Sequence, residues 1–204
     1  MKNRICQILF LILMISCKSK SDFKTIDFDI FEISVPQNWK KIEMKGIDSY
    51  VGGIVTEKED TLTFDIGLYS EDATKNNLPL VFDTKNFAEF SYKEKERLKK
   101  TNHLIIDSLS EKIDFSKYLP QKFEIEKIDC FEAKIIRPTN KGFGTTGIYI
   151  DSLEGSKKMF NKLKMSFYGE DLSKETEIKF IKALKTIRLK KYCHHPPITK
   201  NCNT

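Results

Sequence analysis

Cysteine and histidine residues near the C-terminus are the side chains best suited to do chemistry in this chain. Cys193, His194, His195 and Cys202 supply thiolate and imidazole groups, which zinc and copper both bind. Adjacent histidines rarely converge on one ion, however, and this spacing matches no zinc-finger pattern. In an oxidising compartment Cys193 and Cys202 are close enough to close a small disulfide loop, although spacing does not exclude a bond to Cys130. The sequence favours this disulfide or free thiols, with a metal site as the weaker alternative.

Two other patterns contain residue types that occur in active sites. His103, Asp107 and Ser108 could supply a catalytic triad, but residues so close in sequence do not readily reach the relay geometry, and no nucleophile elbow surrounds the serine. The glycine-rich stretch 141–147 lacks the order of a phosphate-binding loop and leads into a predicted strand, which favours a hairpin turn. We therefore predict no catalytic residue, no enzymatic activity and no cofactor.

The first seventeen residues are typical of an export signal. Lys2 and Arg4 precede an apolar run, 5–15, that is too short to span a bilayer, which needs about 20 residues. With Ser16 and Cys17 behind it, the segment resembles a bacterial lipoprotein signal. The resemblance implies that Cys17 is lipidated and becomes the mature N-terminus, which would anchor the protein to a membrane. An ordinary cleaved signal and a retained anchor are the alternatives.

The remaining chain is predicted to form one domain. We expect a signal peptide at 1–16, a lipidated cysteine and polar tether at 17–26, a single domain at 27–190 and an irregular tail at 191–204. Removing the signal takes away two positive charges, so the formal charge falls from +6 to +4. Lysines alternate with acidic residues along the chain rather than gathering in a stripe, so no nucleic-acid partner is expected.

Hydrophobic periodicity predicts more strands than helices. Alternating or apolar stretches predict strands at 28–35, 50–56, 61–69, 122–136, 144–150 and 162–168. The stretch 122–136 is one bent strand or two strands broken near Asp129, and Cys130 is expected to be a buried strand residue. Helices are predicted over 86–100 and from Ser173, a plausible N-cap. The apolar stripe of the second helix is predicted at Ile178, Ile181, Leu184 and Ile187.

This order of elements predicts an α+β fold, an antiparallel β-sheet flanked by helices. The segment 31–39, a strand followed by Pro36 and Trp39, resembles the opening of PsbP-like and DcrB-like proteins. The segment 167–171 and the helix that follows it resemble the end of the same domain. The resemblance implies an α/β/α sandwich. It also implies a protein that is not an enzyme, since members of this group serve mostly as assembly factors, extrinsic subunits and adaptors.

Two functions of different classes are consistent with these features. The first is a lipoprotein of the cell envelope, anchored through Cys17 to the outer or inner membrane and facing the periplasm, that binds another envelope protein or peptide. The second is a carrier of a small apolar ligand or a metal ion. The carrier would need a closed apolar cavity or convergent polar ligands.

Overall fold

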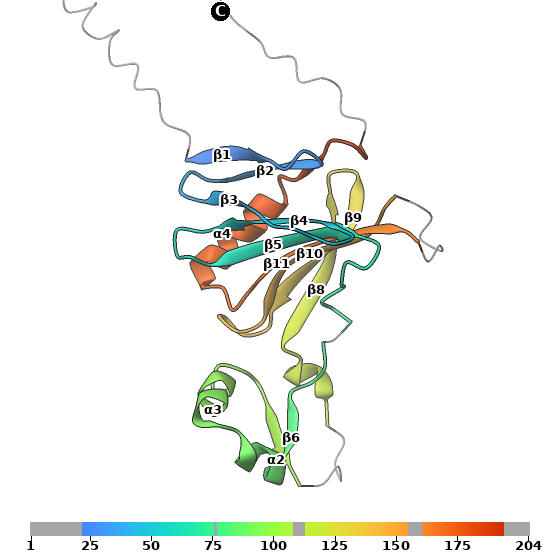
Figure 1. Cartoon of the computed structure of the whole chain (residues 1–204). Coiled ribbons are helices and arrows are strands. Elements are labelled where there is room, and N and C mark those ends of the chain that lie inside the picture. Colours follow the sequence, from blue (N-terminus) through green and yellow to red (C-terminus); the bar gives the residue numbers. More distant parts are fainter. Residues whose placement is uncertain (1–21, 76, 108–112, 155–160, 194–204) are drawn as a thin grey trace, which may run out of the picture.

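The computed structural model of the chain describes residues 22–75, 77–107, 113–154 and 161–193. Its largest element is a seven-stranded antiparallel sheet, the main sheet (Figure 1). In spatial order its strands are β3 (Lys40–Glu43), β4 (Tyr50–Val55), β5 (Thr61–Gly67), β11 (Leu163–Glu170), β10 (Thr145–Glu154), β9 (Phe131–Pro138) and β8 (Gln121–Ile128). The predicted hairpin of β4 and β5 is confirmed. The stretch 122–136 forms two strands that separate at Asp129, a left-handed turn residue with φ of 55°.

A second layer covers one face of the main sheet. It consists of the helix α4 (Lys174–Leu184) and a three-stranded small sheet of β1 (Phe23–Asp27), β2 (Phe31–Pro36) and β12 (Arg188–Leu189). The alternating residues Phe31, Ile33 and Val35 of β2 are fully buried, because one face of this strand points into the core. The ring of Phe31 lies 5.0 Å from that of Phe64 in β5. We refer to the two layers together as the sandwich.

The helix α4 begins where the sequence predicts. The side chain of Ser173 caps its first turn, and Glu175 complements the positive end of the helix dipole. The predicted apolar stripe is partly wrong, because Ile178 is 46% exposed while Phe180 is fully buried. Phe180 packs 5.2 Å from Phe167 of β11. This contact fixes which side of the helix faces the main sheet.

A lobe formed by residues 78–107 and 113–119 projects from the sandwich between β5 and β8 (Figure 1). It contains β6 (Val81–Asp83), α2 (Thr84–Glu89), α3 (Tyr92–Leu98), β7 (Leu104–Ile106) and the 3-10 helix η1 (Phe115–Tyr118). The strands β6 and β7 pair in parallel. The single helix predicted over 86–100 is two helices, because Ser91 starts a new capping box with Glu94.

The predicted α/β/α sandwich is wrong. About 45% of the structure is strand and 18% is helix, so the fold is closer to a β-sandwich. The physical reason is that only α4 packs on the main sheet. The other predicted helix lies in the lobe, away from the sheet, and the second face of the main sheet carries no layer of helices among the described residues.

The predicted domain boundaries also shift by a few residues. Strand β1 begins at Phe23, so residues 23–26 belong to the small sheet rather than to the tether. At the other end, residues 191–193 of the predicted tail are held on the sandwich, where Cys193 is buried and Tyr192 packs against the core. Among the described residues, no helix is long and apolar enough to cross a membrane.

Candidate interaction site

An aromatic cluster forms the centre of the lobe. Phe82 of β6 lies 5.1 Å from Phe90 in an edge-to-face contact, and Phe87 lies 5.8 Å from Phe90. The imidazole of His103 stacks on Phe87 at 5.7 Å. None of these four rings is buried, and Leu98 is the one buried apolar side chain among the described residues of the lobe. The cluster is therefore a core that is covered on only part of its surface.

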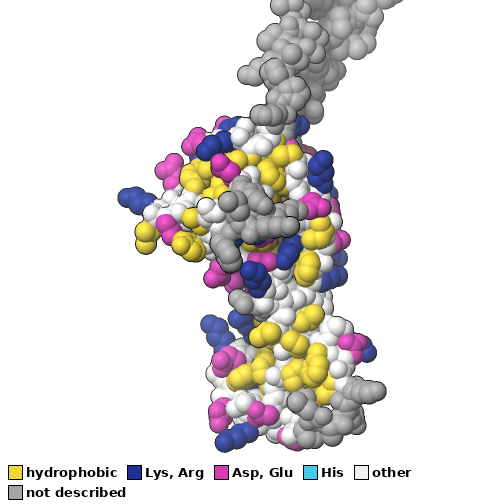
Figure 2. Space-filling view, turned by 90° about the vertical axis from the view of Figure 1, so that its right-hand side faces the viewer, with side chains coloured by type: hydrophobic (Ala, Val, Ile, Leu, Met, Phe, Trp, Pro, Cys, Tyr) yellow, Lys and Arg dark blue, Asp and Glu magenta, His cyan; other side chains and the backbone are white. Residues whose placement is uncertain are grey.

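Further apolar side chains on the lobe point into solvent. Figure 2 shows hydrophobic side chains gathered over the lower part of the molecule, where the lobe lies. The exposed fractions are 71% for Leu78, 80% for Tyr92, 40% for Ile105 and 40% for Phe115. Contiguous exposed apolar surface on a small protein commonly marks a site of interaction. We call these four residues and the aromatic cluster the lobe surface.

Specific contacts hold the lobe against the sandwich. The guanidinium of Arg97 in α3 lies 2.8 Å from the carboxylate of Asp171 and 4.9 Å from the ring of Phe143. The same carboxylate accepts a hydrogen bond from the N–H of Gly144. At the base of the lobe, the side chain of Asn77 donates to the carbonyl of Gln121 in β8 at 2.7 Å and accepts from its N–H at 3.1 Å. These contacts position the lobe surface relative to the main sheet.

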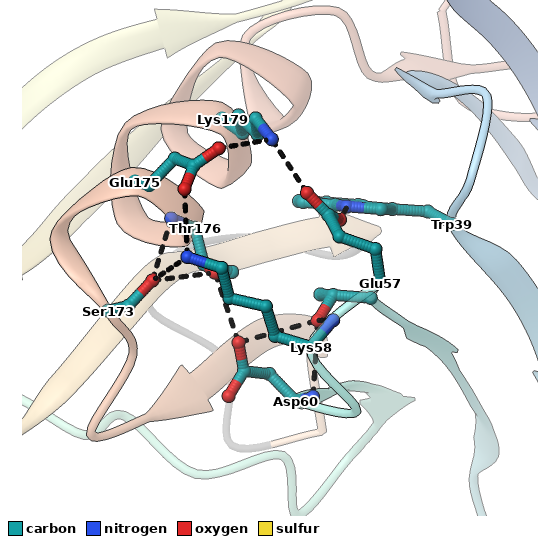
Figure 3. Close-up of polar contacts among 9 residues, drawn as sticks. Trp39, Glu57, Lys58, Asp60, Ser173, Glu175, Thr176 and Lys179 are labelled. Carbon is teal, nitrogen blue, oxygen red and sulfur yellow. Dashed lines mark hydrogen bonds and ion pairs between the residues drawn. The ribbon is translucent and has the colours of Figure 1, made fainter.

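An extensive polar network lies at the start of α4 (Figure 3). Lys179 binds Glu57 at 2.6 Å and Glu175 at 2.8 Å, and Lys58 binds Glu175 at 2.8 Å. Hydrogen bonds from Lys179 and Lys58 hold the pKa of Glu175 at about 2, well below its ordinary value. Glu57 also accepts a hydrogen bond from the indole of Trp39, which is fully buried. The network links the β4–β5 turn to α4 and Trp39, which is a structural role.

A second polar group lies on the face of the main sheet opposite the second layer. The carboxylate of Asp72, 3% exposed, accepts hydrogen bonds from Lys134 at 2.6 Å and from Thr74 at 2.6 Å. Burial raises the pKa of Asp72, but the hydrogen bonds from Lys134 and Thr74 outweigh burial, and the net shift is downward. Nearby, burial followed by the charge of Asp151 raises the pKa of the Tyr149 hydroxyl. Asp72 therefore stays ionised and Tyr149 protonated at neutral pH.

This polar group borders a shallow hollow of about 300 Å³, whose lining includes Ile125, Phe131, Lys134 and Tyr149. Asp72 is engaged by Lys134, and Asp151 by Lys162 and Tyr149. Only 3% of the Asp72 side chain is exposed, so its carboxylate has little access to a substrate, and the carboxylate of Asp151 is neutralised by Lys162. We assign the group to stabilising the loop that carries Asp72.

Cys193 forms a disulfide with Cys130, and their Cα atoms lie 6.0 Å apart. The predicted bond between Cys193 and Cys202 is therefore wrong, and the alternative bond to Cys130 is the one that forms. Cys130 lies in the exposed two-residue turn between β8 and β9 rather than inside a strand, and the turn brings it beside the C-terminal segment. Sequence spacing could not select this bond, because the two cysteines are 63 residues apart and only the folded chain brings them together.

The disulfide also removes one member of the alternative metal site. A sulfur in a disulfide is not a thiolate and offers Cys193 no ligand for zinc or copper. The other three members, His194, His195 and Cys202, lie outside the described residues. Within the described ranges, no group of three or more histidine, cysteine or acidic side chains converges on one point.

The remaining sequence candidates are not brought together. His103 packs in the aromatic cluster, Asp107 follows β7, and Ser108 lies outside the described residues, as does Cys17. The glycine-rich stretch forms the predicted turn before β10, where Gly142 and Gly144 take positive φ angles of 74° and 112°. Phe87 and Phe90 are the sequence signal for the lobe surface, because together with Leu98 they form one apolar side of the helix predicted over 86–100.

No family model matches this sequence, and a comparison with curated proteins also finds no match.

Proposed function

We propose that this protein is a lipid-anchored, non-enzymatic binding module of the cell envelope that presents its lobe surface to another envelope protein. The observation that carries the proposal is the partly covered aromatic cluster of Phe82, Phe87, Phe90 and His103. An aromatic core that is only partly covered leaves apolar area in water, and burying that area against a partner is favourable. Aromatic side chains are also enriched among the residues that dominate binding energy at interfaces.

A folded partner surface suits the lobe better than a small molecule does. The apolar side chains Leu78, Tyr92, Ile105 and Phe115 are spread over several elements, and each is at least 40% exposed. A carrier would enclose its ligand in a closed cavity, with most of the ligand surface buried. In the sandwich, the corresponding interior is filled by rings in contact, such as Phe28, Phe31 and Phe64 at 4.8 to 5.0 Å. The open lobe is the surface that still has area to bury.

The position of the lobe fits an anchored molecule. The strand β1, which follows the proposed anchor at Cys17, lies at the opposite end of the described molecule from the lobe (Figure 1). The five residues 18–22 between Cys17 and β1 span at most about 18 Å when fully extended. The small sheet would then lie near the membrane, and the lobe would point away from it toward a partner.

Site-specific photo-crosslinking in the producing cells tests this proposal. A photo-reactive p-benzoylphenylalanine replaces Tyr92 on the lobe or, as the matched control, Tyr69 on the sandwich, two tyrosines that are 80% and 77% exposed. We expect one discrete adduct from position 92 and none from position 69. Equal adducts from both positions, or none from either, would contradict the proposal.

A second pair of variants tests the surface itself. Ile105→Lys places a charge on the lobe surface, and Ile178→Lys places the same charge on α4 at a comparably exposed position, 40% and 46% respectively. The first variant should reduce the adduct from position 92 at least about fivefold, because a charge in an apolar interface must be desolvated, and the second should not. Cys17→Ala should remove the adduct if the anchor delivers the protein to its partner.

A further inference from the structure

Two segments of the chain, residues 77–80 and 118–121, connect the lobe to the sandwich and form a narrow neck (Figure 1). Beyond this neck, none of the described helices and strands of the lobe packs along a strand or helix of the sandwich. Parts of a protein that share little packed surface move relative to one another. The orientation of the lobe therefore depends on the neck and on side chains that reach across from the lobe to the sandwich.

One end of the neck is bonded to the sandwich. The side chain of Asn77 holds both backbone groups of Gln121, the first residue of β8. The N–H of Thr139 donates to the carbonyl of Pro120 at 2.8 Å, and the side chain of Gln121 donates to the hydroxyl of Thr145 in β10 at 3.2 Å. Residues 77, 120 and 121 are therefore fixed to the main sheet.

The other end of the neck is bonded to the lobe. The N–H of Leu80 donates to the carbonyl of Tyr118 at 2.9 Å, and the N–H of Leu104 in β7 donates to the carbonyl of Leu80 at 2.9 Å. Residues 78–79 on one segment and residue 119 on the other lie between these bonds and those of the sandwich. Hinges in proteins are a few residues of this kind, which absorb the change in backbone dihedral angles when two parts rotate.

Away from the neck, the side chain of Arg97 in α3 reaches the sandwich. Its guanidinium lies 2.8 Å from the carboxylate of Asp171 and 4.9 Å from the ring of Phe143. The Arg97 side chain is 57% exposed and that of Asp171 is 39% exposed, so water and salt both weaken the ion pair. An exposed ion pair shifts an equilibrium by less than about fivefold. The contact therefore favours one orientation of the lobe without fixing it.

The sandwich holds its half of this contact in place. The backbone of Asp171 is left-handed, with φ of 50°, and its N–H donates to the carbonyl of Gly144 at 2.9 Å. Its carboxylate accepts a hydrogen bond from the N–H of Gly144 at 2.8 Å. Neither bond involves Arg97, so the carboxylate keeps its position when the guanidinium leaves. The contact can then re-form without any rearrangement of the sandwich.

We propose that the lobe pivots on the neck at residues 78–79 and 119, and that the contact of Arg97 with Asp171 and Phe143 is a latch that holds one of its orientations. When the latch opens, α3 moves away from the sandwich. The aromatic cluster moves with it, because β6, α2 and β7 all lie on the lobe side of the neck. The lobe surface then points in a different direction relative to the sandwich. The pivot does not require the proposed partner, so it is measured on the protein alone.

Double electron–electron resonance between two nitroxide spin labels tests the pivot in the full chain. The residue p-acetylphenylalanine, which takes an oxime-linked label and spares the native cysteines, replaces Lys93 in α3 and Lys182 in α4, both exposed. We expect one main distance for the latched lobe and a second, broader component for the open lobe. Arg97→Ala and Asp171→Asn should each enlarge the second component at least about threefold. Asparagine tolerates the left-handed backbone and still accepts the bond from Gly144, so Asp171→Asn preserves the turn.

Lys99→Ala is the control, because it removes an exposed ion pair inside the lobe, and it should leave the distances unchanged. Raising the salt from about 0.05 M to about 0.5 M should enlarge the second component in the wild type but not in Arg97→Ala, which lacks the ion pair. A single component that is the same in all variants would overturn the pivot. Two components in proportions that Arg97→Ala and Asp171→Asn leave unchanged, or that Lys99→Ala changes equally, would overturn the latch.

Discussion

Phenylalanine rings build two clusters in this protein, and the two differ in how much water they exclude. In the sandwich, Phe31, Phe64 and Phe167 are fully buried and contact one another at 5.0 to 6.1 Å. In the lobe, Phe82 and Phe87 make ring contacts at similar distances but remain partly exposed. The same side chain therefore stabilises the fold in one region and leaves apolar surface available in the other. The two clusters differ in exposure because two layers enclose the rings of the sandwich, whereas the rings of the lobe are covered on only part of their surface.

The largest expected effect comes from truncating one ring in each cluster. Phe167→Ala should lower the free energy of unfolding by about 3–5 kcal/mol, because it leaves a cavity in a close-packed core. Phe87→Ala should lower it by less than about 1 kcal/mol, since the ring is already partly in water. Denaturant titration measures both values. Comparable losses from the two variants would show that the lobe is part of the same cooperative core.

Breaking the disulfide should act on the sandwich and spare the lobe. A double change, Cys130→Ser with Cys193→Ser, should cost about 2–4 kcal/mol, because the bond closes a long loop in the unfolded chain. Amide hydrogen exchange should rise in β8, β9 and the C-terminal segment and stay unchanged in α2 and α3. Exchange that rises equally in the lobe would contradict a division into two regions of separate stability.

The Asp72–Lys134 pair should make part of the stability of the sandwich depend on pH. The pKa of Asp72 in the folded protein lies below the ordinary value of 3.8. The contribution of the Asp72 carboxylate to the free energy of unfolding is therefore present above that value and is lost as pH falls through the folded pKa. Asp72→Asn removes this dependence. The stability difference between wild type and Asp72→Asn should shrink as pH is lowered from about pH 5 to about pH 2. A difference that stays constant over this range in denaturant titrations would contradict the assignment.

The smallest effect is expected where the two regions meet. Arg97→Ala removes the ion pair to Asp171, an exposed contact worth less than about 1 kcal/mol, so global stability should hardly change. The lobe should nevertheless open more often, which limited proteolysis within residues 84–98 would detect as faster cleavage. Lys99→Ala is the matched control, because it removes an exposed ion pair that lies wholly within the lobe.

Local features of the sequence determined many of the elements. The cap at Ser173 starts α4 as predicted, and the alternation predicted as a strand over 28–35 forms β2, which begins only at Phe31. Asp129 lies in the turn between β8 and β9, which is one of the two predicted alternatives. These features depend on neighbours within a few residues, where capping, periodicity and turn chemistry act. A proposed lipid anchor at Cys17 rests on the same kind of local pattern.

Only the tertiary structure decided how these elements are combined. The bond of Cys130 to Cys193 joins residues 63 positions apart, which no spacing rule selects. The break at Ser91 and the departure of α2 and α3 from the main sheet turned an expected helical layer into a lobe with exposed aromatic rings. Periodicity identifies which side of an element is apolar, but not whether another layer covers it. That depends on contacts between distant segments, and here those contacts leave the lobe surface only partly covered by the described residues.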